Sequence, residues 1–269
     1  MLLIRCFIIC CATIFNYCYA EIAQVKAMKD VMKYFENADC NTLAVFDVDM
    51  VLVQPSDPAF QMANMKRHKE IARSISQTVP KDKKEIFLTL MILDSDSILI
   101  EDRTPHYLQQ LSHRGIPTIA LTANLTGQLG TISNLELWKL QRLCNLGIDF
   151  RNSAPIQKNH VFVDLPPYRG NYSVYDNGIL FANGAVCPKG DVLVRFLQIN
   201  NLHPKQIIFV DDREENLKNV ESALCAYNPN IQFHGIHYLG AEFYPSQPVS
   251  QEEFQAKWQS IAESVKDLN

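Results

Sequence analysis

The chain of 269 residues is 47% hydrophobic and 20% charged, with a net charge of −4 and an isoelectric point near 6.0. This composition excludes a disordered chain, a collagen and a coiled coil, and the length suits one α/β domain with insertions, since such domains often reach about 250 residues. The acidic balance and the lack of a long basic run argue against a nucleic-acid-binding module, so we expect no nucleic-acid partner.

The first twenty residues have the pattern of a secretory signal peptide. Arg5 is the only charge before Glu21, and residues 6–20 are uncharged and mostly apolar. This stretch is shorter than the roughly 20 apolar residues that a membrane-spanning helix needs. We therefore expect cleavage after Ala20, a secreted or periplasmic protein, and no stable membrane anchor after cleavage. A retained anchor is the alternative.

Four cysteines follow this segment, namely Cys40, Cys144, Cys187 and Cys225. They form no CxxC pair, which argues against a structural zinc site and a thioredoxin-like motif. An oxidising compartment would permit one or two disulfides among them. Small buried thiols are the alternative, and the sequence leaves both open.

Three short apolar runs each end at a polar residue: residues 42–46 at Asp47, residues 118–121 at Thr122 and residues 207–210 at Asp211. Continuous apolar runs of this length are typical of strands buried on both faces of a parallel sheet. The sequence therefore predicts an α/β fold, a Rossmann-like doubly wound parallel sheet. Because ligands bind at the carboxyl ends of such strands, the three polar residues are expected to converge on one site.

Amphipathic patterns predict crossover helices at 104–115, 191–200 and 214–227. Thr104 and Pro105 have the pattern of a cap followed by a first helical residue. A further strand is predicted at 231–238. The chain ends in a helix with an apolar stripe, interpreted as core, that consists of Phe254, Trp258, Ile261 and Val265.

Two insertions interrupt this pattern within a predicted domain that covers residues 21–269. The first, at about 54–101, contains a helix around residues 60–76, a break at Pro80 and an apolar run over 86–93. The second, at about 125–185, contains a helix near 135–144 and a β-hairpin over 172–182, where Asn177 and Gly178 favour a tight turn. Insertions at the ligand-binding edge typically act as caps or substrate loops, so we expect a helical cap and a β-hairpin cap.

The chemistry-bearing residues cluster at the predicted strand ends. Asp47 and Asp49 form a DxD pair directly after the first buried strand. A DxD pair alone is a weak indication, since a calcium loop or a solvated turn has the same pattern. The context strengthens it, because Asp211 and Asp212 end another predicted strand and Lys189 opens a helix between the two.

In chain order, four segments resemble the four motifs of the haloacid dehalogenase-like (HAD) superfamily: Phe46-Asp47-Val48-Asp49-Met50-Val51, Leu121-Thr122-Ala123-Asn124, Lys189, and Phe209-Val210-Asp211-Asp212. The resemblance spans residues 42–216 and implies a HAD-like core. The signal segment, the length and the insertions also resemble an uncharacterised HAD-like group of intracellular bacteria and, more distantly, secreted acid phosphatases of the same superfamily.

The resemblance implies a role for each motif residue. Asp47 would be the nucleophile, which forms an aspartyl-phosphate labile enough to be hydrolysed. Asp49 would protonate the leaving alcohol and then take a proton from water, as in the phosphatase branch of the superfamily. Thr122, Ala123 and Lys189 would bind the substrate phosphate, and Lys189 would also stabilise the charge on Asp47.

The resemblance also implies Mg²⁺ as the cofactor, since an anionic nucleophile needs charge neutralisation to attack a phosphate. Asp47, the backbone carbonyl of Asp49 and Asp212 would hold it, with Asp211 as a further candidate ligand. Asn216 stands where many relatives carry another acidic residue, which leaves one charge fewer in the site.

Several alternatives stay open at this stage. Thr122 could cap the next helix, and Lys158 is a second candidate for the motif lysine. The basic run at residues 66–73 could attract an anionic substrate, although a solvated helix face is the favoured interpretation. The tyrosines of the second insertion, which could stack on a ligand or pair across strands, are Tyr168, Tyr172 and Tyr175.

The sequence as a whole predicts a secreted, Mg²⁺-dependent phosphomonoester hydrolase that acts on a small-molecule phosphate ester. A phosphotransferase to an acceptor other than water is one alternative. A binding or effector protein that lost turnover is another, for which the departures at Met50 and Asn216 are the reason for suspicion. A sugar-nucleotide enzyme fits the pattern less well. The sequence indicates neither the substrate nor an oligomeric state.

Overall fold

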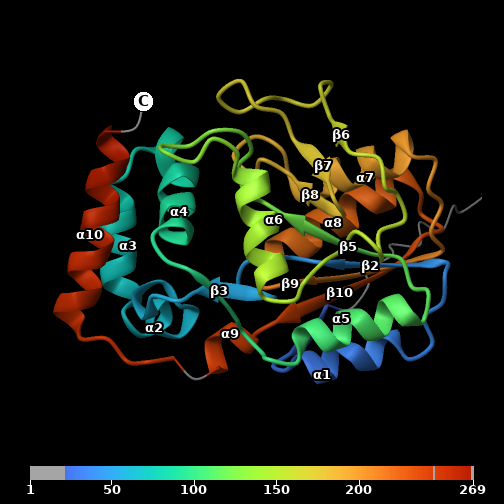
Figure 1. The fold of residues 1–269 in the computed structure, drawn as a ribbon, viewed down its shortest axis with the longest axis horizontal. Helices are drawn as coiled ribbons and strands as arrows, with labels where there is room; N and C mark the ends of the chain where they lie inside the picture. Colours follow the sequence, from blue (N-terminus) through green and yellow to red (C-terminus); the bar gives the residue numbers. More distant parts are fainter. Residues whose placement is uncertain (1–21, 245, 268–269) are drawn as a thin grey trace, which may run out of the picture.

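The centre of the structure is a mostly parallel β-sheet. A computed structural model describes residues 22–244 and 246–267 (Figure 1). Within them, eight strands lie in the order β1 (Ala23–Val25), β10 (Gln232–Tyr238), β9 (Gln206–Asp211), β2 (Thr42–Phe46), β5 (Thr118–Thr122), β8 (Ile179–Phe181), β7 (Val174–Asp176) and β6 (His160–Val161). The first six are parallel to one another, and β7 and β6 pair antiparallel. The predicted strands are confirmed.

The middle strand β2 lies between β5 and β9, so the chain leaves it first on one side and returns on the other. Its side chains alternate between two layers: Ala44 and Phe46 pack with one apolar core, and Leu43 and Val45 with another. A reversal of strand order opens a crevice at the carboxyl ends of the strands beside it. The crevice therefore lies beyond Phe46.

Helices cover both faces of the sheet. One face carries α1 (Met28–Val31), the 3₁₀ turn η1 (Met32–Phe35) and α5 (Thr104–His113). The other face carries α7 (Lys189–Ile199) and α8 (Glu214–Tyr227), which pack against each other. A short helix, α9 (Gly240–Phe243), follows β10. This is the doubly wound α/β architecture that the sequence predicts.

The start of α5 differs from the prediction by one residue. Arg103 occupies the cap position, and the Thr104 hydroxyl, which is buried, has no hydrogen-bond partner within the described part of the chain. The reason is a turn in which the Thr104 N–H donates to the carbonyl of Glu101 at 2.9 Å, because this places Thr104 inside the first helical turn. The predicted end is confirmed, since Gly115 adopts a φ of 69° just after the helix.

The first insertion forms a helical cap on a two-stranded ribbon, in which β3 (Val53–Pro55) pairs antiparallel with β4 (Ser97–Leu99). Between them lie η2 (Pro58–Phe60), α2 (Met62–Arg67), α3 (Lys69–Thr78), η3 (Lys81–Lys83) and α4 (Lys84–Leu93). The C-terminal helix α10 (Gln251–Asp267) packs on α3 and α4 (Figure 1). Its stripe is core, as predicted, but it is the core of the cap and not of the sheet.

The second insertion contributes α6 (Leu135–Asn145) and a hairpin made of β7 and β8. Asn177 and Gly178 form its turn with φ values of 49° and 86°, as the Asn-Gly pair predicts. The expectation of a hairpin cap is corrected. Strand β8 pairs parallel with β5, because its apolar residues, all buried, extend the central sheet.

The signal segment, residues 1–20, lies outside the described residues, so cleavage after Ala20 and secretion stay predictions. Among the described residues, no helix combines the length and apolar character needed to cross a membrane. The four described cysteines are free, and only Cys187 is buried. Within its described part, the structure therefore contains no disulfide. The alternative of small buried thiols holds for Cys187 alone among the four.

The packing of α10 against the cap can be tested at Trp258. Its indole packs edge-on against Phe87, with ring centroids 5.8 Å apart, and its Nε1 donates to the Ala59 carbonyl at 3.0 Å. Trp258→Ala should therefore lower the free energy of unfolding by about 3–5 kcal/mol in urea denaturation. Gln259→Ala, an exposed change on the same helix, is the matched control. A loss in Trp258→Ala no larger than in this control would contradict the packing.

Candidate functional site

The structure brings all the predicted site residues together at the carboxyl ends of β2, β5 and β9. Six of them line one cavity of about 230 Å³, namely Asp47, Asp49, Thr122, Ala123, Lys189 and Asp212. The seventh, Asp211, lies directly beneath it and is fully buried. Residues of the first insertion also line the cavity.

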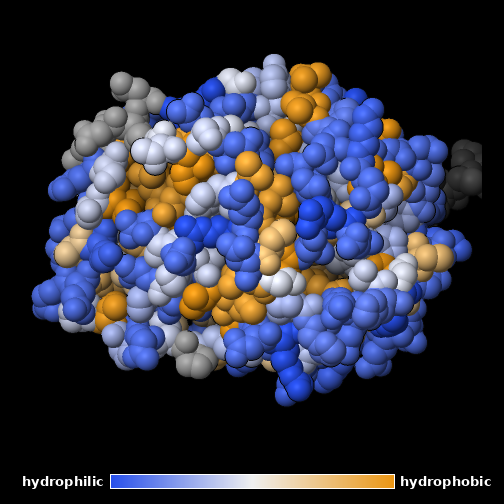
Figure 2. All heavy atoms as spheres, viewed as in Figure 1, coloured by the Kyte–Doolittle hydropathy of each residue, from blue (hydrophilic) through white to orange (hydrophobic). Residues whose placement is uncertain are grey.

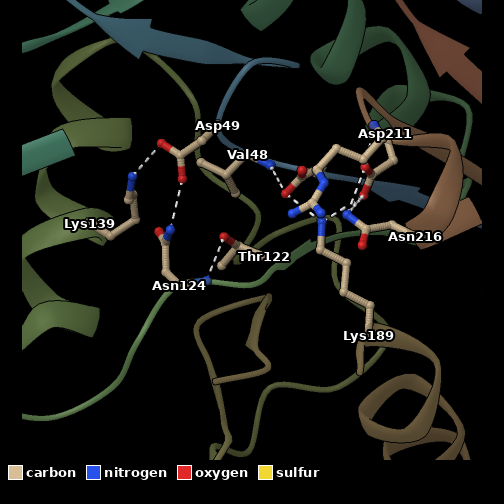
Figure 3. A network of polar contacts seen from close by, with 10 residues as sticks. Val48, Asp49, Thr122, Asn124, Lys139, Lys189, Asp211 and Asn216 are labelled. Atoms are coloured by element: carbon tan, nitrogen blue, oxygen red, sulfur yellow. Dashed lines mark hydrogen bonds and ion pairs between the residues drawn. The ribbon is translucent and has the colours of Figure 1, made fainter. Parts of the chain in front are cut away.

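Lys189 is the central cation of this site. Its Nζ lies 2.8 Å from Asp47 Oδ1. It also lies 2.6 Å from Asp211 Oδ2 (Figure 3). Burial alone would lower the pKa of Lys189, but the attraction of Asp211 and Asp47 outweighs it and raises that pKa. The side chain therefore joins the ends of two neighbouring strands as a charged group.

The close approach of two helices positions Lys189. It is the first residue of α7, and the N–H of Gly190 donates to Asn219 Oδ1 on α8 at 2.8 Å. A Cβ at position 190 would lie 2.7 Å from the Cβ of Ala223. Glycine is required here because any side chain would push α7 away from α8 and withdraw Lys189 from the carboxylates.

Asp47 continues the ladder of β2, since its N–H donates to the carbonyl of Val210 at 2.8 Å. Its Oδ1 accepts from the Val48 N–H at 2.7 Å and contacts Lys189. Within the described chain, Oδ2 has no hydrogen-bond partner. Burial raises the pKa of Asp47 to about 7 against the attraction of Lys189, and the charge of Asp211 adds to the increase.

The two neighbouring aspartates have different surroundings. Asp211 accepts from Lys189, from the Arg213 N–H at 2.8 Å, and from Asn216 Nδ2 at 2.9 and 3.2 Å. Its oxygens are thus fully used in holding Lys189 and the strand end. Asp212 instead lines the cavity, and burial, together with the charges of Asp47 and Asp211, raises its pKa well above the usual value.

The acidic cluster suits a hard divalent cation. Oxygen atoms of Asp47, Asp211 and Asp212 lie within 4.8 Å of one another, and burial together with their mutual repulsion raises the pKa values of Asp47 and Asp212. Carboxylate oxygens without sulfur or imidazole ligands are the set that Mg²⁺ and Ca²⁺ prefer. Because Asp211 is already saturated, Asp47 and Asp212 are the carboxylates free to bind.

Asp49 is held by Asn124, which the sequence analysis placed in the second motif without a role, and by Lys139, which it missed. Its Oδ1 lies 2.8 Å from Lys139 Nζ and its Oδ2 accepts from Asn124 Nδ2 at 2.9 Å. Lys139 belongs to α6, and its side chain is only 3% exposed. In Figure 3 the Asp49 carboxylate points toward these two residues and away from Lys189 and Asp211. The two carboxylates of the DxD pair thus have separate cations.

The sequence contains a pattern that could have identified Lys139 as a buried residue with a charge partner. Lys139 occupies the buried stripe of α6, one turn from Leu135 and one turn from Leu143, and all three side chains are buried. A lysine within an apolar stripe must find a charge partner, because an unpaired buried ammonium is very costly. The partner, Asp49, lies 90 residues away in the chain. The helix pattern therefore indicates that Lys139 has a charge partner but does not identify that partner as Asp49.

Met50 adopts a left-handed conformation with a φ of 63°. Its N–H donates to the carbonyl of Val53 at 2.8 Å, and the buried side chains of Val51 and Leu52 hold the turn in place. Such a conformation costs a non-glycine residue roughly 1–2 kcal/mol. The turn places Asp49 at the cavity, which Met50 also lines. After the turn, the chain enters the first insertion.

The structure decides two of the open alternatives for the polar site residues. Thr122 does not cap a helix, since the next helix, α6, is capped by the side chain of Asn134. The Thr122 hydroxyl instead accepts from the Asn124 N–H at 3.2 Å at the wall of the cavity. Lys158 is exposed and does not line the cavity, so Lys189 is the lysine at the acidic cluster.

The basic run and the tyrosines lie outside the cavity. Lys66 pairs with Glu242, and Arg73 pairs with Glu70 on its own helix. Tyr175 is buried in the sheet and donates to the carbonyl of Ile156. These residues therefore support the structure or the solvated surface.

Fold and site together define a mixed α/β protein with a mostly parallel sheet and an acidic cluster at its strand ends. Residues 24–268 match the family described as "Protein of unknown function (DUF2608)". The chain therefore belongs to the DUF2608 family.

The relatives of the chain are bacterial proteins without an assigned function. An uncharacterised protein of Rickettsia typhi is 30% identical over 81% of this chain and 77% of its own length. An uncharacterised protein of Rickettsia prowazekii is 30% identical over 81% of this chain and 76% of its own. One from Rickettsia bellii is 28% identical over 73% and 68%, respectively. No solved structure matches.

The pairing of Lys139 with Asp49 can be measured by a double-mutant cycle. Lys139→Met should lower the free energy of unfolding by about 3 kcal/mol, because it leaves a largely buried carboxylate without its cation. Combined with Asp49→Asn, the loss should shrink by more than about 1 kcal/mol. Lys33→Met, which breaks the exposed pair with Asp30, should have far less effect. Additive losses at Lys139 and Asp49 would argue against the pair.

Proposed function

We propose that this chain is a Mg²⁺-dependent phosphomonoester hydrolase of the HAD type that acts through an aspartyl-phosphate on Asp47. The convergence of Asp47, Thr122, Lys189 and Asp212 on one cavity carries this proposal. These residues come from separate segments, and they meet at the crevice where ligands bind in open parallel sheets. Their order along the chain also matches the order of the HAD motifs.

In the first step, an oxygen of Asp47 attacks the phosphorus atom, and the bond from phosphorus to the ester oxygen breaks. Lys189 holds Oδ1, which leaves Oδ2 for the attack. The Thr122 hydroxyl and the backbone of Ala123 lie at the cavity wall, where they can donate to phosphoryl oxygens. Water then attacks the aspartyl-phosphate, releases inorganic phosphate and restores Asp47.

Asp49 gives a proton to the leaving oxygen and takes one from the attacking water. This role requires Asp49 to take up a proton from solvent, which weakens its pairing with Lys139, and to turn from Lys139 and Asn124 toward the ester when the substrate binds. Asp49 and Asn124 both line the cavity, so the movement is a side-chain rotation at its wall, away from Lys139. A correctly placed acid and base contributes roughly 10²- to 10⁴-fold to such a reaction.

The carboxylates of Asp47 and Asp212, with the backbone carbonyl of Asp49, would hold the Mg²⁺ ion. When bound, Mg²⁺ supplies positive charge that neutralises and orients the phosphoryl group. Asp211 stays with Lys189 and keeps its ammonium between the strand ends. The protein is thus able to place two cationic charges against a dianionic phosphate.

Hydrolysis itself is the first test. The protein lacking residues 1–20 should release phosphate from phosphomonoesters in the presence of Mg²⁺, and EDTA should abolish the release. Asp47→Asn should reduce turnover to background because the amide is not a nucleophile for phosphorus. Asp102→Asn, an exposed aspartate outside the cavity, is the control. Full activity of Asp47→Asn would overturn the mechanism, and a new phosphoester on addition of alcohol would indicate phosphotransfer.

Metal binding has a separate readout in thermal stability. Mg²⁺ should raise the melting temperature of the wild type, since at a hundredfold excess over Kd a ligand stabilises by about 2.7 kcal/mol. In Asp212→Asn the Mg²⁺-dependent increase should largely disappear. Without metal this variant should melt above the wild type, because the substitution removes a buried charge beside Asp47 and Asp211. An equal response to Mg²⁺ in both proteins would exclude Asp212 as a ligand.

A phosphate-binding protein without turnover is the second candidate. The observation in its favour is the double restraint on Asp49, whose two oxygens are engaged by Lys139 and Asn124. Mg²⁺-dependent binding of inorganic phosphate without hydrolysis of any ester would support this candidate.

A further inference from the structure

Helix α4 has apolar side chains on more than one face, and its place in the cap explains only part of them. Ile86 and Phe87 are buried in the cap core, against which α10 packs. Leu88 and Ile92, on the other side, line the cavity above the acidic cluster. A helix that is apolar all round normally buries all its faces. The cavity side of α4 therefore carries apolar surface that the cap core does not use.

Leu88 is the clearest case. Its side chain is 45% exposed, whereas Ile86 and Phe87 are each 2% exposed. Leu88 and Ile92 are four residues apart and thus share one helix face with Glu85 and Thr89, which also line the cavity. Figure 2 shows hydrophobic residues at the surface of the cap, in the area where α4 lies in Figure 1.

The cavity has two unlike walls. The wall at the sheet is polar and includes Asp47, Thr122 and Lys189. The opposite wall comes from the first insertion and the turn before it, and its apolar members are Met50, Pro55, Phe60, Met65, Leu88, Met91 and Ile92. Methionine side chains adapt to apolar groups of varied shape. A phosphate on the polar wall would thus place its organic part against apolar side chains.

The charge and the size of the cavity restrict which organic group the substrate can carry. Glu85 is the charged residue of α4 at the cavity, and burial raises its pKa against the attraction of Arg213. A second anionic group on the substrate would meet this carboxylate, while the Arg213 guanidinium, which also lines the cavity, forms an exposed pair with Glu215 at 3.0 Å. The volume of about 230 Å³ is below the roughly 300–1,000 Å³ of common ligand pockets. The site therefore suits a small organic group.

A polyhydroxylated group fits the apolar wall poorly. On α4, only Thr89 and Glu85 offer polar atoms to the cavity, and the Thr89 hydroxyl already donates to the carbonyl of Glu85 at 2.7 Å. Sugar hydroxyls buried against Leu88 and Ile92 would lose their hydrogen bonds to water without replacement, which is unfavourable for each hydroxyl.

We propose that the preferred substrates are phosphate monoesters of small, uncharged, apolar alcohols, whose organic part packs against Leu88 and Ile92 of α4. This inference rests on the proposed phosphatase function and adds the substrate class to it.

Matched esters test the preference with little change in leaving-group chemistry. Propyl phosphate and glycerol 3-phosphate share a three-carbon skeleton and differ by two hydroxyls. With Mg²⁺, kcat/KM should be at least tenfold higher for propyl phosphate. From ethyl through butyl phosphate it should rise about three- to fourfold with each methylene, the factor that burial of one CH₂ provides.

The matched variants are Leu88→Asp and Leu137→Asp. Both change an exposed leucine on a helix, but Leu137 lies on α6 and does not line the cavity. Leu88→Asp should lower kcat/KM for butyl phosphate at least tenfold and abolish its advantage over ethyl phosphate. Leu137→Asp should retain the wild-type values for both esters.

Binding of alkylphosphonates, measured by calorimetry with Mg²⁺, tests the apolar subsite separately from the phosphatase activity. The reason is that the carbon–phosphorus bond is not hydrolysed, so binding is measured without turnover. Affinity should increase from methyl- to butylphosphonate in the wild type and stay flat in Leu88→Asp. Ester hydrolysis without preference for propyl over glycerol esters would overturn the substrate class and retain the phosphatase. Chain-length-dependent phosphonate binding without any ester hydrolysis would support the ligand class and overturn the phosphatase. Phosphonate affinities independent of chain length would overturn the apolar subsite.

Discussion

The site depends on one buried ammonium. Lys189 lies between Asp47 at the end of β2 and Asp211 at the end of β9, with contacts of 2.8 and 2.6 Å. Without it, three carboxylates would meet at the strand ends with no direct counter-charge, and loss of one partner from a buried ion pair costs about 3–5 kcal/mol. The close contact of α7 and α8 at Gly190 and the saturation of Asp211 both serve to keep this cation in place. Packing of the sheet edge and the chemistry of the cavity are therefore set by the same residue.

The two carboxylates of the DxD pair are controlled by different parts of the chain. Asp47 is fixed by Lys189 at the start of α7, whereas Asp49 is fixed by Lys139 of the second insertion and by Asn124 of the loop after β5. The first insertion meets neither carboxylate through a hydrogen bond or ion pair within the described residues, and supplies the apolar wall. In the proposed reaction, the second insertion thus governs proton transfer and the first governs recognition of the organic group.

The sequence predicted those parts of the fold and site that depend on local patterns. Each buried strand is a continuous apolar run, and the polar residue that ends it, such as Asp47 or Thr122, follows directly in the chain. The missed parts depend on contacts between distant segments. Lys139 meets Asp49 across 90 residues, and Trp258 of α10 meets Ala59 across 199. The hairpin turn at Asn177 was predictable, but its partner strand was not, because a buried apolar strand can pair with any exposed sheet edge.

The shared core of the cap has a consequence for the order in which the protein forms. The sheet strands and the acidic residues are all present once residue 238 has been synthesised, but the cap core also needs Phe254, Trp258 and Val265 of α10. Without α10, the apolar faces of α3 and α4 lack part of their cover. A chain with all its sheet strands but without α10 would thus have an incomplete cap core, and such exposed apolar surface makes an intermediate prone to aggregation. A premature stop after β10 would keep the protein at that stage.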